Sequence, residues 1–262
     1  MKKLPALFFI LLLFSCKQEK EWKLTWSDEF NYQGVPDTSK WIAETGGDGW
    51  GNNELQYYTA NRPENARVEN GLLIIEARKE NWENNKYTSA RLITKSKGDP
   101  IAAGWQYGKI ETRAKLPKGL GTWPAIWMLA STHPPAWPDD GEIDIMEHVG
   151  FNQGFIHGSI HCKKYNHIIG TQKTNTIEVK DCSEQFHVYS VEWNKDSLKI
   201  AVDGNVFFRF KNEHSGYDAW PFDNKMHLLL NVAVGGNWGG QKGVDTTIWP
   251  RRMEVDYVRV YQ

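Results

Sequence analysis

Three carboxylic acids lie close together in the segment 142–147, Glu-Ile-Asp-Ile-Met-Glu. Side chains alternate between the two faces of a regular strand, so Glu142 and Asp144 share a face while Glu147 points the other way. A bulge near residues 145–146 would return Glu147 to the face of the other two acids. Three acids on one face repel one another, so at least one of them holds a proton near neutral pH. A protonated acid beside an ionised carboxylate can hydrolyse a glycosidic bond, whereas the plainer alternative is an exposed acidic strand.

Tryptophans surround this acidic segment in the sequence and favour the catalytic interpretation. Trp123, Trp127 and Trp137 precede it, and Trp238 follows it within a Gly-Gly-Asn-Trp-Gly-Gly stretch. Indole faces stack on the apolar faces of sugar rings, and glycine lets the backbone approach a ligand closely. The alternative for each tryptophan is burial in the core. A tryptophan among glycines is hard to bury, so the pattern favours a substrate cleft most strongly at Trp238.

Two histidines, His157 and His161, are separated by the spacing that puts both on one face of a strand. A pair of this kind could ligate a metal ion. No third ligand follows at a matching spacing, so the pattern favours hydrogen bonding to a sugar or support of acid–base chemistry.

Strands are indicated almost everywhere in the chain, and they must position these residues. Period-2 alternation runs through residues 108–116, 188–193, 198–202 and 253–261, and residues 226–234 form a nearly continuous apolar run. No window has a sustained helical period. Many short strands at regular spacing predict an all-β protein, either a sandwich or a barrel.

Composition excludes several classes of protein. The 262 residues carry 31 Lys and Arg against 32 Asp and Glu, a net charge of −1, without the basic stripe that nucleic acid requires. The 13 Trp, 10 Tyr and 11 Phe supply too much buriable surface for a disordered chain. Only one long apolar run exists, at the start, which excludes a polytopic membrane protein.

The N-terminus has the pattern of an export signal. Two lysines precede a short apolar run over residues 4–14, and Leu-Phe-Ser-Cys then resembles a bacterial lipobox that would leave Cys16 lipidated. The alternative is an ordinary signal peptide. We therefore expect a lipid-anchored protein of the outer membrane or cell surface, with a periplasmic or secreted protein as the alternative. The expected divisions are a signal peptide at 1–15, a lipidated tether at 16–21 and one catalytic domain at 22–262.

Two further cysteines, Cys162 and Cys182, would meet an oxidising compartment in an exported protein. The sequence leaves two arrangements open, because it gives no distance between them. They form a disulfide, or they are separate thiols.

The acidic segment resembles the signature of family 16 glycoside hydrolases in its bulged, six-residue form. The resemblance extends to Asp-Glu-Phe at 28–30, Asn-Glu-Leu-Gln-Tyr at 53–57, and the segments 119–129, 186–193, 231–240 and 255–261. It is greatest to the laminarinase-like endo-β-1,3-glucanases, some of which also cleave mixed β-1,3/1,4-glucans. It implies a concanavalin A-like β-jelly-roll sandwich with an open substrate cleft on the concave sheet.

The resemblance also implies roles for individual residues and retention of the anomeric configuration. Glu142 would be the nucleophile and Glu147 the general acid/base, with Asp144 between them tuning both pKa values. Catalysis would need no cofactor. Seven residues match substrate-binding positions: Asn53, Arg91, Trp123, Trp127, Trp137, His161 and Trp238. A structural calcium ion away from the cleft would use Glu29, Asp256 and the backbone carbonyl of Gly71.

Three functions compete for this sequence, and in each we expect a monomer whose partner is a polysaccharide. The first is endo-hydrolysis of β-1,3-glucan, of mixed-linkage glucan or of both. The second is a family 16 galactan hydrolase of the agarase or carrageenase type, and the third is a surface glycan-binding lipoprotein without activity. A binding protein has no use for three clustered acids, and the Trp-Pro-Ala and Asn-Trp-Gly-Gly stretches favour the glucanase.

Overall fold

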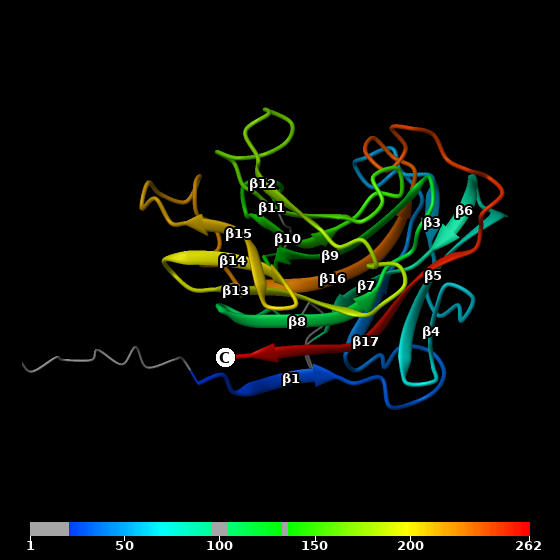
Figure 1. Ribbon diagram of the computed structural model, residues 1–262, viewed down its shortest axis with the longest axis horizontal. Helices are drawn as coiled ribbons and strands as arrows, with labels where there is room; N and C mark the ends of the chain where they lie inside the picture. Colours follow the sequence, from blue (N-terminus) through cyan, green and yellow to red (C-terminus); the bar gives the residue numbers. More distant parts are fainter. Residues whose placement is uncertain (1–20, 96–103, 133–135) are drawn as a thin grey trace, which may run out of the picture.

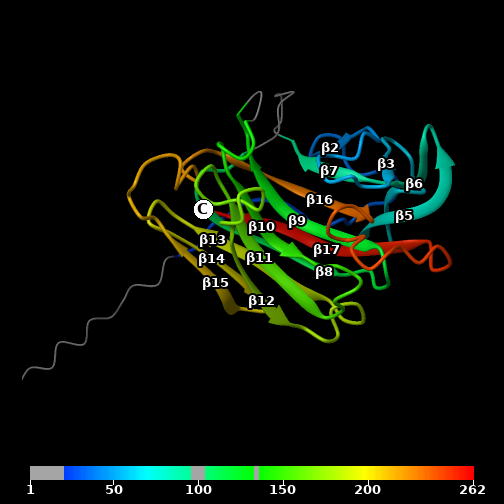
Figure 2. The ribbon, with the colours of Figure 1, turned by 90° about the horizontal axis from the view of Figure 1, so that it is seen from above.

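The computed structural model describes residues 21–95, 104–132 and 136–262, and this part contains strands and turns but no helix. The strands form two sheets that pack face to face around one apolar core (Figure 1). Figure 2 shows the same layers from above. The all-β class expected from strand periodicity is therefore confirmed, and of the two architectures left open the structure is the sandwich, as the family resemblance implied.

The larger sheet has ten strands, and its order follows the hydrogen bonding between neighbours. Its main path runs β15 (Asn205–Lys211), β14 (Ser197–Val202), β13 (His187–Trp193), β8 (Gly108–Lys115), β17 (Arg251–Tyr261), β5 (Leu72–Trp82), β6 (Asn85–Ser89), β3 (Gln56–Tyr58). Off this path, β1 (Leu24–Asp28) pairs with β17, and β4 (Ala66–Glu69) pairs with β5.

The smaller sheet has seven strands and carries the acidic segment. Its order is β12 (Lys173–Glu178), β11 (Phe155–His161), β10 (Glu142–Glu147), β9 (Thr122–Ala130), β16 (Met226–Val234), β7 (Arg91–Thr94), β2 (Trp41–Glu44). Every pairing in this sheet is antiparallel.

Alternation along β9 shows how one strand serves two environments. Ile126 and Met128 are fully buried in the core between the sheets, whereas Trp123 and Trp127 are partly exposed on the opposite side. We call that opposite side of the seven-stranded sheet the outer face. All nine residues of β16 are buried, as its nearly continuous apolar run predicts, because side chains from neighbouring segments also cover its outer side.

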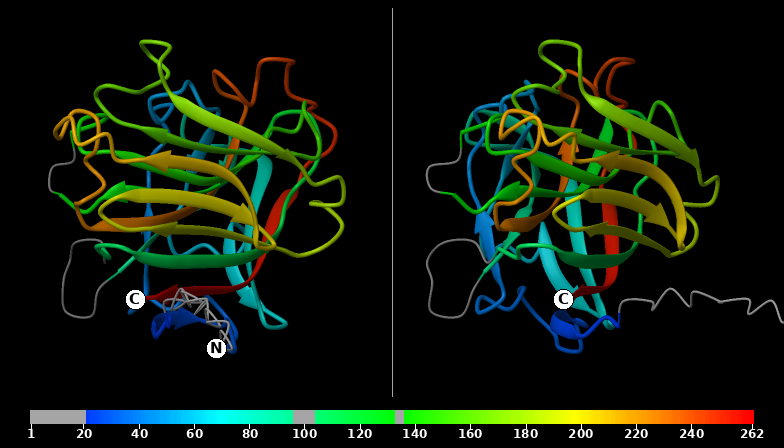
Figure 3. Two further views of the ribbon diagram at one scale, coloured as in Figure 1. Left: turned by 60° about the vertical axis from the view of Figure 1, so that its left-hand side comes forward. Right: turned by 90° about the vertical axis from the view of Figure 1, so that its left-hand side faces the viewer.

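The two ends of the described chain lie side by side. β1 pairs with the C-terminal strand β17, and Lys23 and Gln262 exchange backbone hydrogen bonds, so the first and last strands close the same sheet (Figure 3). The expected signal peptide at 1–15 and the lipidated Cys16 lie outside the described residues. Within the described ranges, no helix is long and apolar enough to cross a bilayer.

The disulfide alternative for Cys162 and Cys182 is wrong, since both are buried free thiols. Cys162 directly follows β11, whereas the Cys182 sulfur lies 3.7 Å from the side chain of Gln153, which precedes the same strand. The seven residues of β11 separate the two sites by roughly 20 Å, far beyond the Cα separation that a disulfide spans.

Candidate active site

A bulge in β10 brings the three acids to the outer face. Asp144 pairs with Trp127 of β9 and Glu147 with Ala125, so a step of three residues on β10 matches a step of two on β9. The register with β11 shifts at the same place. Because the matching step on the partner strand is even, Glu147 returns to the side that Asp144 occupies. The bulge expected from the spacing of the acids is confirmed.

The register of the whole sheet aligns one row of residues across its outer face. Each member pairs directly with the next on the neighbouring strand. The row runs from β12 to β2 through Thr176, His157, Glu147, Ala125, Asn231, Arg91 and Glu44. Glu147 thus lies between His157 on one side and, beyond a small alanine, three polar residues on the other.

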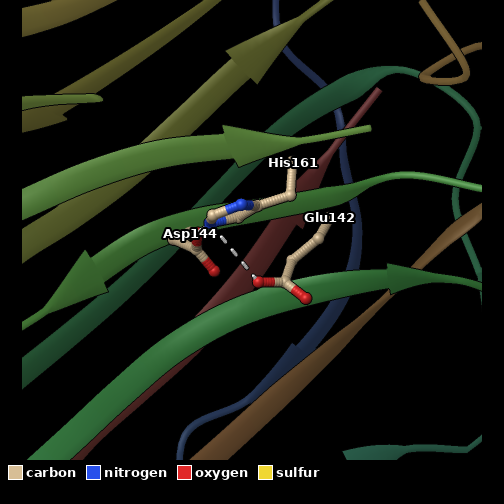
Figure 4. A group of neighbouring side chains, drawn as sticks. All are labelled: Glu142, Asp144 and His161. Carbon is tan, nitrogen blue, oxygen red and sulfur yellow. Dashed lines mark ion pairs between the residues drawn. The ribbon is translucent and has the colours of Figure 1, made fainter. Parts of the chain in front are cut away.

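Glu142 is held by groups on both sides of its carboxylate. Trp137 Nε1 donates a hydrogen bond to Oε2 at 2.8 Å, and His161 Nε2 lies 3.8 Å from Oε1 (Figure 4). Burial, followed by the charge of Asp144, raises the pKa of Glu142 to about 8, while His161 and the Trp137 hydrogen bond oppose the shift.

Asp144 is the most enclosed of the three acids, with 2 % of its surface exposed. Its Oδ2 lies 3.2 Å from His161 Nε2. That oxygen accepts no hydrogen bond from any residue in the described part of the chain. Burial raises the pKa of Asp144 to about 7. The side chain therefore stands between two glutamates with little hydrogen bonding of its own.

Glu147 holds its proton most strongly of the three. Trp123 Nε1 donates to its Oε1 at 3.0 Å, but burial and then the charges of Asp144 and Glu142 raise the pKa of Glu147 well above its usual range. Loss of a proton is easier at Glu142, because Asp144 is the only neighbouring charge that opposes ionisation there, whereas the charges of Asp144 and Glu142 both oppose it at Glu147. The strand can therefore supply one protonated acid and one ionised carboxylate.

A directed chain of hydrogen bonds supports Trp127, which pairs with Asp144 across β9 and β10. Trp127 Nε1 donates to Asn231 Oδ1 at 2.7 Å, and Asn231 Nδ2 donates to the Tyr58 hydroxyl at 3.0 Å. The Tyr58 hydroxyl then donates to Glu54 Oε2 at 3.2 Å, and Gln56 Nε2 donates to the same oxygen at 2.6 Å. Every donor in the chain points towards one buried carboxylate, which fixes the plane of the indole.

Arg91 lies between two aromatic rings beside this chain. Its guanidinium carbon is 4.6 Å from the ring centroid of Trp50 and 4.8 Å from that of Trp127. Its Nε also donates to Glu44, the next residue in the row. Stacking and ion pairing together hold the guanidinium in one orientation. The acids therefore have a bordering surface on one side, which we call the aromatic–arginine wall. It consists of Trp50, Trp127 and Arg91 with the hydrogen-bond chain of Asn231, Tyr58, Gln56 and Glu54.

The remaining predicted residues divide between two places. Trp238 packs edge-on against Trp123 at 5.6 Å and against His157 at 4.9 Å, so it belongs with Glu147. Asn53 donates to Asn237 Oδ1 at 2.8 Å and lies in the loop that contacts β16. The structure therefore brings all seven predicted binding residues to the outer face or its bordering loops, and the three acids to its centre.

Contributors that the sequence did not single out include Glu54, Tyr58, Asn231, Trp50 and His167. Trp50 stands between Gly49 and Gly51, so the same pattern that marked Trp238 would have found it. His167 packs 5.3 Å from Trp137 and 5.2 Å from His161, and no pattern in the sequence indicates this contact.

Glu29, Gly71 and Asp256, the residues expected to bind calcium, converge along β17. On one side of β17, β5 pairs with residues 251–255 and β1 with residues 258–261, so the ladder is interrupted beside Asp256. Glu29 follows β1 and Gly71 precedes β5. Each carboxylate is already paired, Glu29 with Arg259 at 2.8 Å and Asp256 with Arg113 at 2.6 Å. Neither carboxylate could bind a calcium ion with the same oxygen atoms without giving up part of its contact with arginine.

Comparison with known proteins places this geometry in context. The model of the glycosyl hydrolases family 16 matches residues 53–259, which include every strand of the outer face except β2. The beta-glucanase of Rhodothermus marinus is 52% identical over 269 aligned residues, covering 99% of this chain and 92% of that protein.

Two solved structures are similar over nearly the whole fold. The laminarinase from Rhodothermus marinus has a TM-score of 0.89 at 52% identity, covering 94% of this chain and 99% of that chain. A variant of SCLam, a non-specific endo-β-1,3(4)-glucanase, has a TM-score of 0.87 at 52% identity, covering 92% and 95%. The latter holds a 1,3-β-D-cellobiosyl-glucose at its active site. The expected jelly-roll sandwich is confirmed by these matches.

Proposed function

The chain belongs to family 16 of the glycosyl hydrolases, and from that membership we propose that it is an endo-acting, retaining hydrolase of β-1,3-glucan and mixed-linkage β-1,3/1,4-glucan. The observation that carries the proposal is the bulged β10, which presents Glu142, Asp144 and Glu147 together on the outer face. The glucan fragment bound by the similar SCLam structure supports the substrate class.

In the proposed reaction the two glutamates exchange roles between two steps. The Glu142 carboxylate attacks the anomeric carbon, while the Glu147 carboxyl group gives its proton to the glycosidic oxygen and the leaving glycan departs. Water then attacks the same carbon, Glu147 takes a proton from it, and the bond to Glu142 breaks. Two inversions leave the configuration unchanged.

Asp144 acts through its neighbours in this mechanism. Its charge adds to burial in raising the pKa of both glutamates. At Glu147 the charge of Glu142 adds to it, so the two carboxylates together favour the proton on Glu147 before the first step. Once Glu142 is bonded to the sugar it is neutral, and the pKa of Glu147 falls, because one of the two repelling charges has gone. The acid of the first step becomes the base of the second.

The residues around the acids supply contacts for the glycan. We propose that Trp123, Trp127, Trp137 and Trp238 stack on glucose rings, and that Arg91 and Asn53 donate hydrogen bonds to hydroxyl groups. Trp123 and Trp137 have a second task, since each donates its indole N–H to one of the catalytic glutamates. A sugar ring stacked on either indole is thereby placed close to the acid that acts on it.

An assay of reducing ends on laminarin, barley β-glucan and agarose tests the proposal against its alternatives. We expect release from the first two polysaccharides and none from agarose. Release from agarose alone would indicate a galactan hydrolase, and binding without any release would indicate a glycan-binding protein. Proton NMR of the first product formed gives the anomeric configuration, and an initial α-product would contradict the retaining mechanism.

The location of the enzyme is a separate proposal that rests on the N-terminal sequence. We propose that residues 1–15 are removed on export and that Cys16 carries the lipid that holds the catalytic domain at the membrane surface. Cys16→Ser should move the protein from the membrane fraction to the soluble fraction. An intact mass showing unmodified Cys16 in a wholly soluble protein would contradict it.

Two further properties complete the proposal. We propose a monomer, whose apparent mass by light scattering should equal that of one chain.

We also propose a structural calcium ion at the interrupted ladder beside Asp256, supported by the convergence of Glu29 and Gly71 on that place. It would join the first and last strands and take no part in catalysis.

A further inference from the structure

We propose that Glu142, Asp144 and His161 form a binding site for a divalent cation of the zinc class, and that this cation and the glycan exclude each other. The three side chains come from two paired strands, since Glu142 and His161 are register partners between β10 and β11. Figure 4 shows the polar ends of the three side chains close together.

The distances between donor atoms fit a small ion. One ligand atom from each residue lies within 4.8 Å of the other two. His161 Nε2 is 3.2 Å from Asp144 Oδ2 and 3.8 Å from Glu142 Oε1. Zinc bonds of roughly 2.0–2.1 Å in a tetrahedron put neighbouring ligand atoms about 3.3 Å apart. Two of the separations are therefore close to those of a zinc site before any side chain moves.

Burial leaves one of these ligand atoms in need of a partner. Asp144 is 2 % exposed, and its Oδ2 has no hydrogen-bond partner among the described residues. A buried carboxylate oxygen without a donor is costly unless it gains a proton or a cation. The Trp137 indole occupies Oε2 of Glu142, so Oε1 can bind an ion while that hydrogen bond stays in place.

The donor set selects the kind of cation. One imidazole nitrogen with two carboxylate oxygens suits zinc, copper and cobalt, whereas magnesium and calcium prefer oxygen ligands alone. Histidine ligands in permanent zinc sites usually donate their other N–H to an acceptor, and loss of that partner costs about 10–100-fold in affinity. His161 Nδ1 has no such acceptor in the described part of the chain. We therefore expect reversible binding rather than a resident metal.

Occupation of this site would block hydrolysis. The ion would take Oε1 of Glu142, the nucleophile, and would neutralise the charge of Asp144. The proposal does not depend on the proposed function, because the cation binds to side chains whether or not the protein cleaves a glycan. It adds a chemical signal, the local concentration of a zinc-class metal, to which the enzyme would respond.

Calorimetric titration of the full chain with zinc, after removal of metals by a chelator, tests the site directly. We expect one equivalent to bind, and His161→Gln and Asp144→Asn each to weaken binding at least tenfold. The matched control is His187→Gln. His187 also has two acidic neighbours, but Asp203 faces its Nδ1 and Asp181 its Nε2, so they cannot share one ion with it. Cys16 is present in every variant and cancels from the comparison.

Copper supplies a spectroscopic signature of the same site. The electron paramagnetic resonance spectrum of the copper-loaded protein should show coupling to one imidazole nitrogen, absent in His161→Gln and kept in His187→Gln. Laminari-oligosaccharide should weaken zinc binding in proportion to its own occupancy. Equal zinc affinity in His161→Gln and the parent, no binding by the parent, or binding unaffected by saturating oligosaccharide would each overturn the proposal. Activity of the metal-free protein on laminarin, measured separately, reports on the hydrolase alone.

Discussion

Two acidic sites lie on the same side of the molecule, the three acids of β10 and the single carboxylate of Glu54. They differ in how many hydrogen bonds and opposite charges their oxygen atoms receive. Glu142, Asp144 and Glu147 crowd one another, and burial with mutual charge raises the pKa of both glutamates. Glu54 is also buried and its pKa is also raised, but Gln56 and Tyr58 donate to it, and the charge of Arg91 favours its ionised form. Burial alone therefore does not identify a catalytic acid. Each catalytic glutamate accepts one indole hydrogen bond and faces the charge of another carboxylate, whereas Glu54 has two side-chain donors and a nearby cation.

Replacing the nucleophile should give the largest effect. Glu142→Gln keeps the volume and the contact with Trp137 but cannot form the bond to the anomeric carbon. The rate on laminarin should fall on the order of 10⁵-fold, as when other enzymes lose a nucleophile. The melting temperature should stay level or rise, because a crowded charge is removed. Wild-type turnover in this variant would refute the assignment.

Removal of the acid should cost less and should depend on the leaving group. Glu147→Ala should lower the rate on laminarin about 10²–10⁴-fold, the usual contribution of a general acid. An aryl glucoside whose leaving group needs no proton should still react in the first step, and azide should then take the place of water and yield a β-glycosyl azide. Absence of rescue by azide with that substrate would count against the role of Glu147.

Trp137→Phe separates stacking from hydrogen bonding at Glu142. The ring remains for a sugar to stack on, while the donor at 2.8 Å from Oε2 is lost. Hydrogen bonds to charged groups contribute about 1.5–3 kcal/mol, and the partly exposed indole should lie near the low end, so kcat should fall about tenfold. KM should change little. A rise in KM at constant kcat would show that the indole only binds substrate.

Variants of Glu54 test the role of the carboxylate whose oxygen accepts hydrogen bonds from Tyr58 and Gln56. Glu54→Ala removes the last acceptor of the chain from Trp127, so binding should weaken and KM should rise, while stability falls by about 1–3 kcal/mol from the unsatisfied Tyr58 and Gln56 groups. Glu54→Gln is the matched control, because it keeps an acceptor for them.

The control also carries a pH signature. The pKa of Glu54 is raised in the folded protein, so its contribution to stability is greatest below its unfolded value of 4.5 and declines as the pH rises through the raised value. Melting curves of Glu54→Gln should therefore lack that decline. An identical pH dependence in the parent and in Glu54→Gln would show that Glu54 does not titrate as a buried acid.

Calcium should have the smallest effect, and it should leave both groups of acids unchanged. Metal-stripped protein should melt a few degrees higher in calcium than in chelator, since about 1 kcal/mol shifts the midpoint of a domain this size by about 2–4 °C. Initial rates on laminarin at 25 °C should be equal in the two conditions. Superimposed melting curves would remove the calcium ion from the account.

The sequence predicted the acids, the bulge and the all-β class because each depends on local spacing, while the choice of a sandwich over a barrel came from the family resemblance. Glu142, Asp144 and Glu147 lie on one strand, where alternation and one extra residue decide their direction. The aromatic–arginine wall could not be predicted from local spacing. Glu54, Tyr58 and Asn231 form a chain only because β16 and the loop before β3 meet, and spacing along the sequence carries no information about that contact. The sequence also left open whether Cys162 and Cys182 form a disulfide, because spacing along the chain does not give the distance between them.

The row across the outer face also has a consequence for the order in which the protein assembles. β9, β10 and β11 are consecutive antiparallel strands, so the acids of β10 can meet Trp127 and His157 through connections between strands that are neighbours in the sequence. Arg91 and Asn231 meet only when β7 joins β16 across a long intervening stretch of chain, a contact that forms slowly in proteins of high contact order. Recovery of hydrolysis after dilution from denaturant should therefore lag behind formation of the β9–β11 meander. The rate at which activity returns would then report on the last stage of folding.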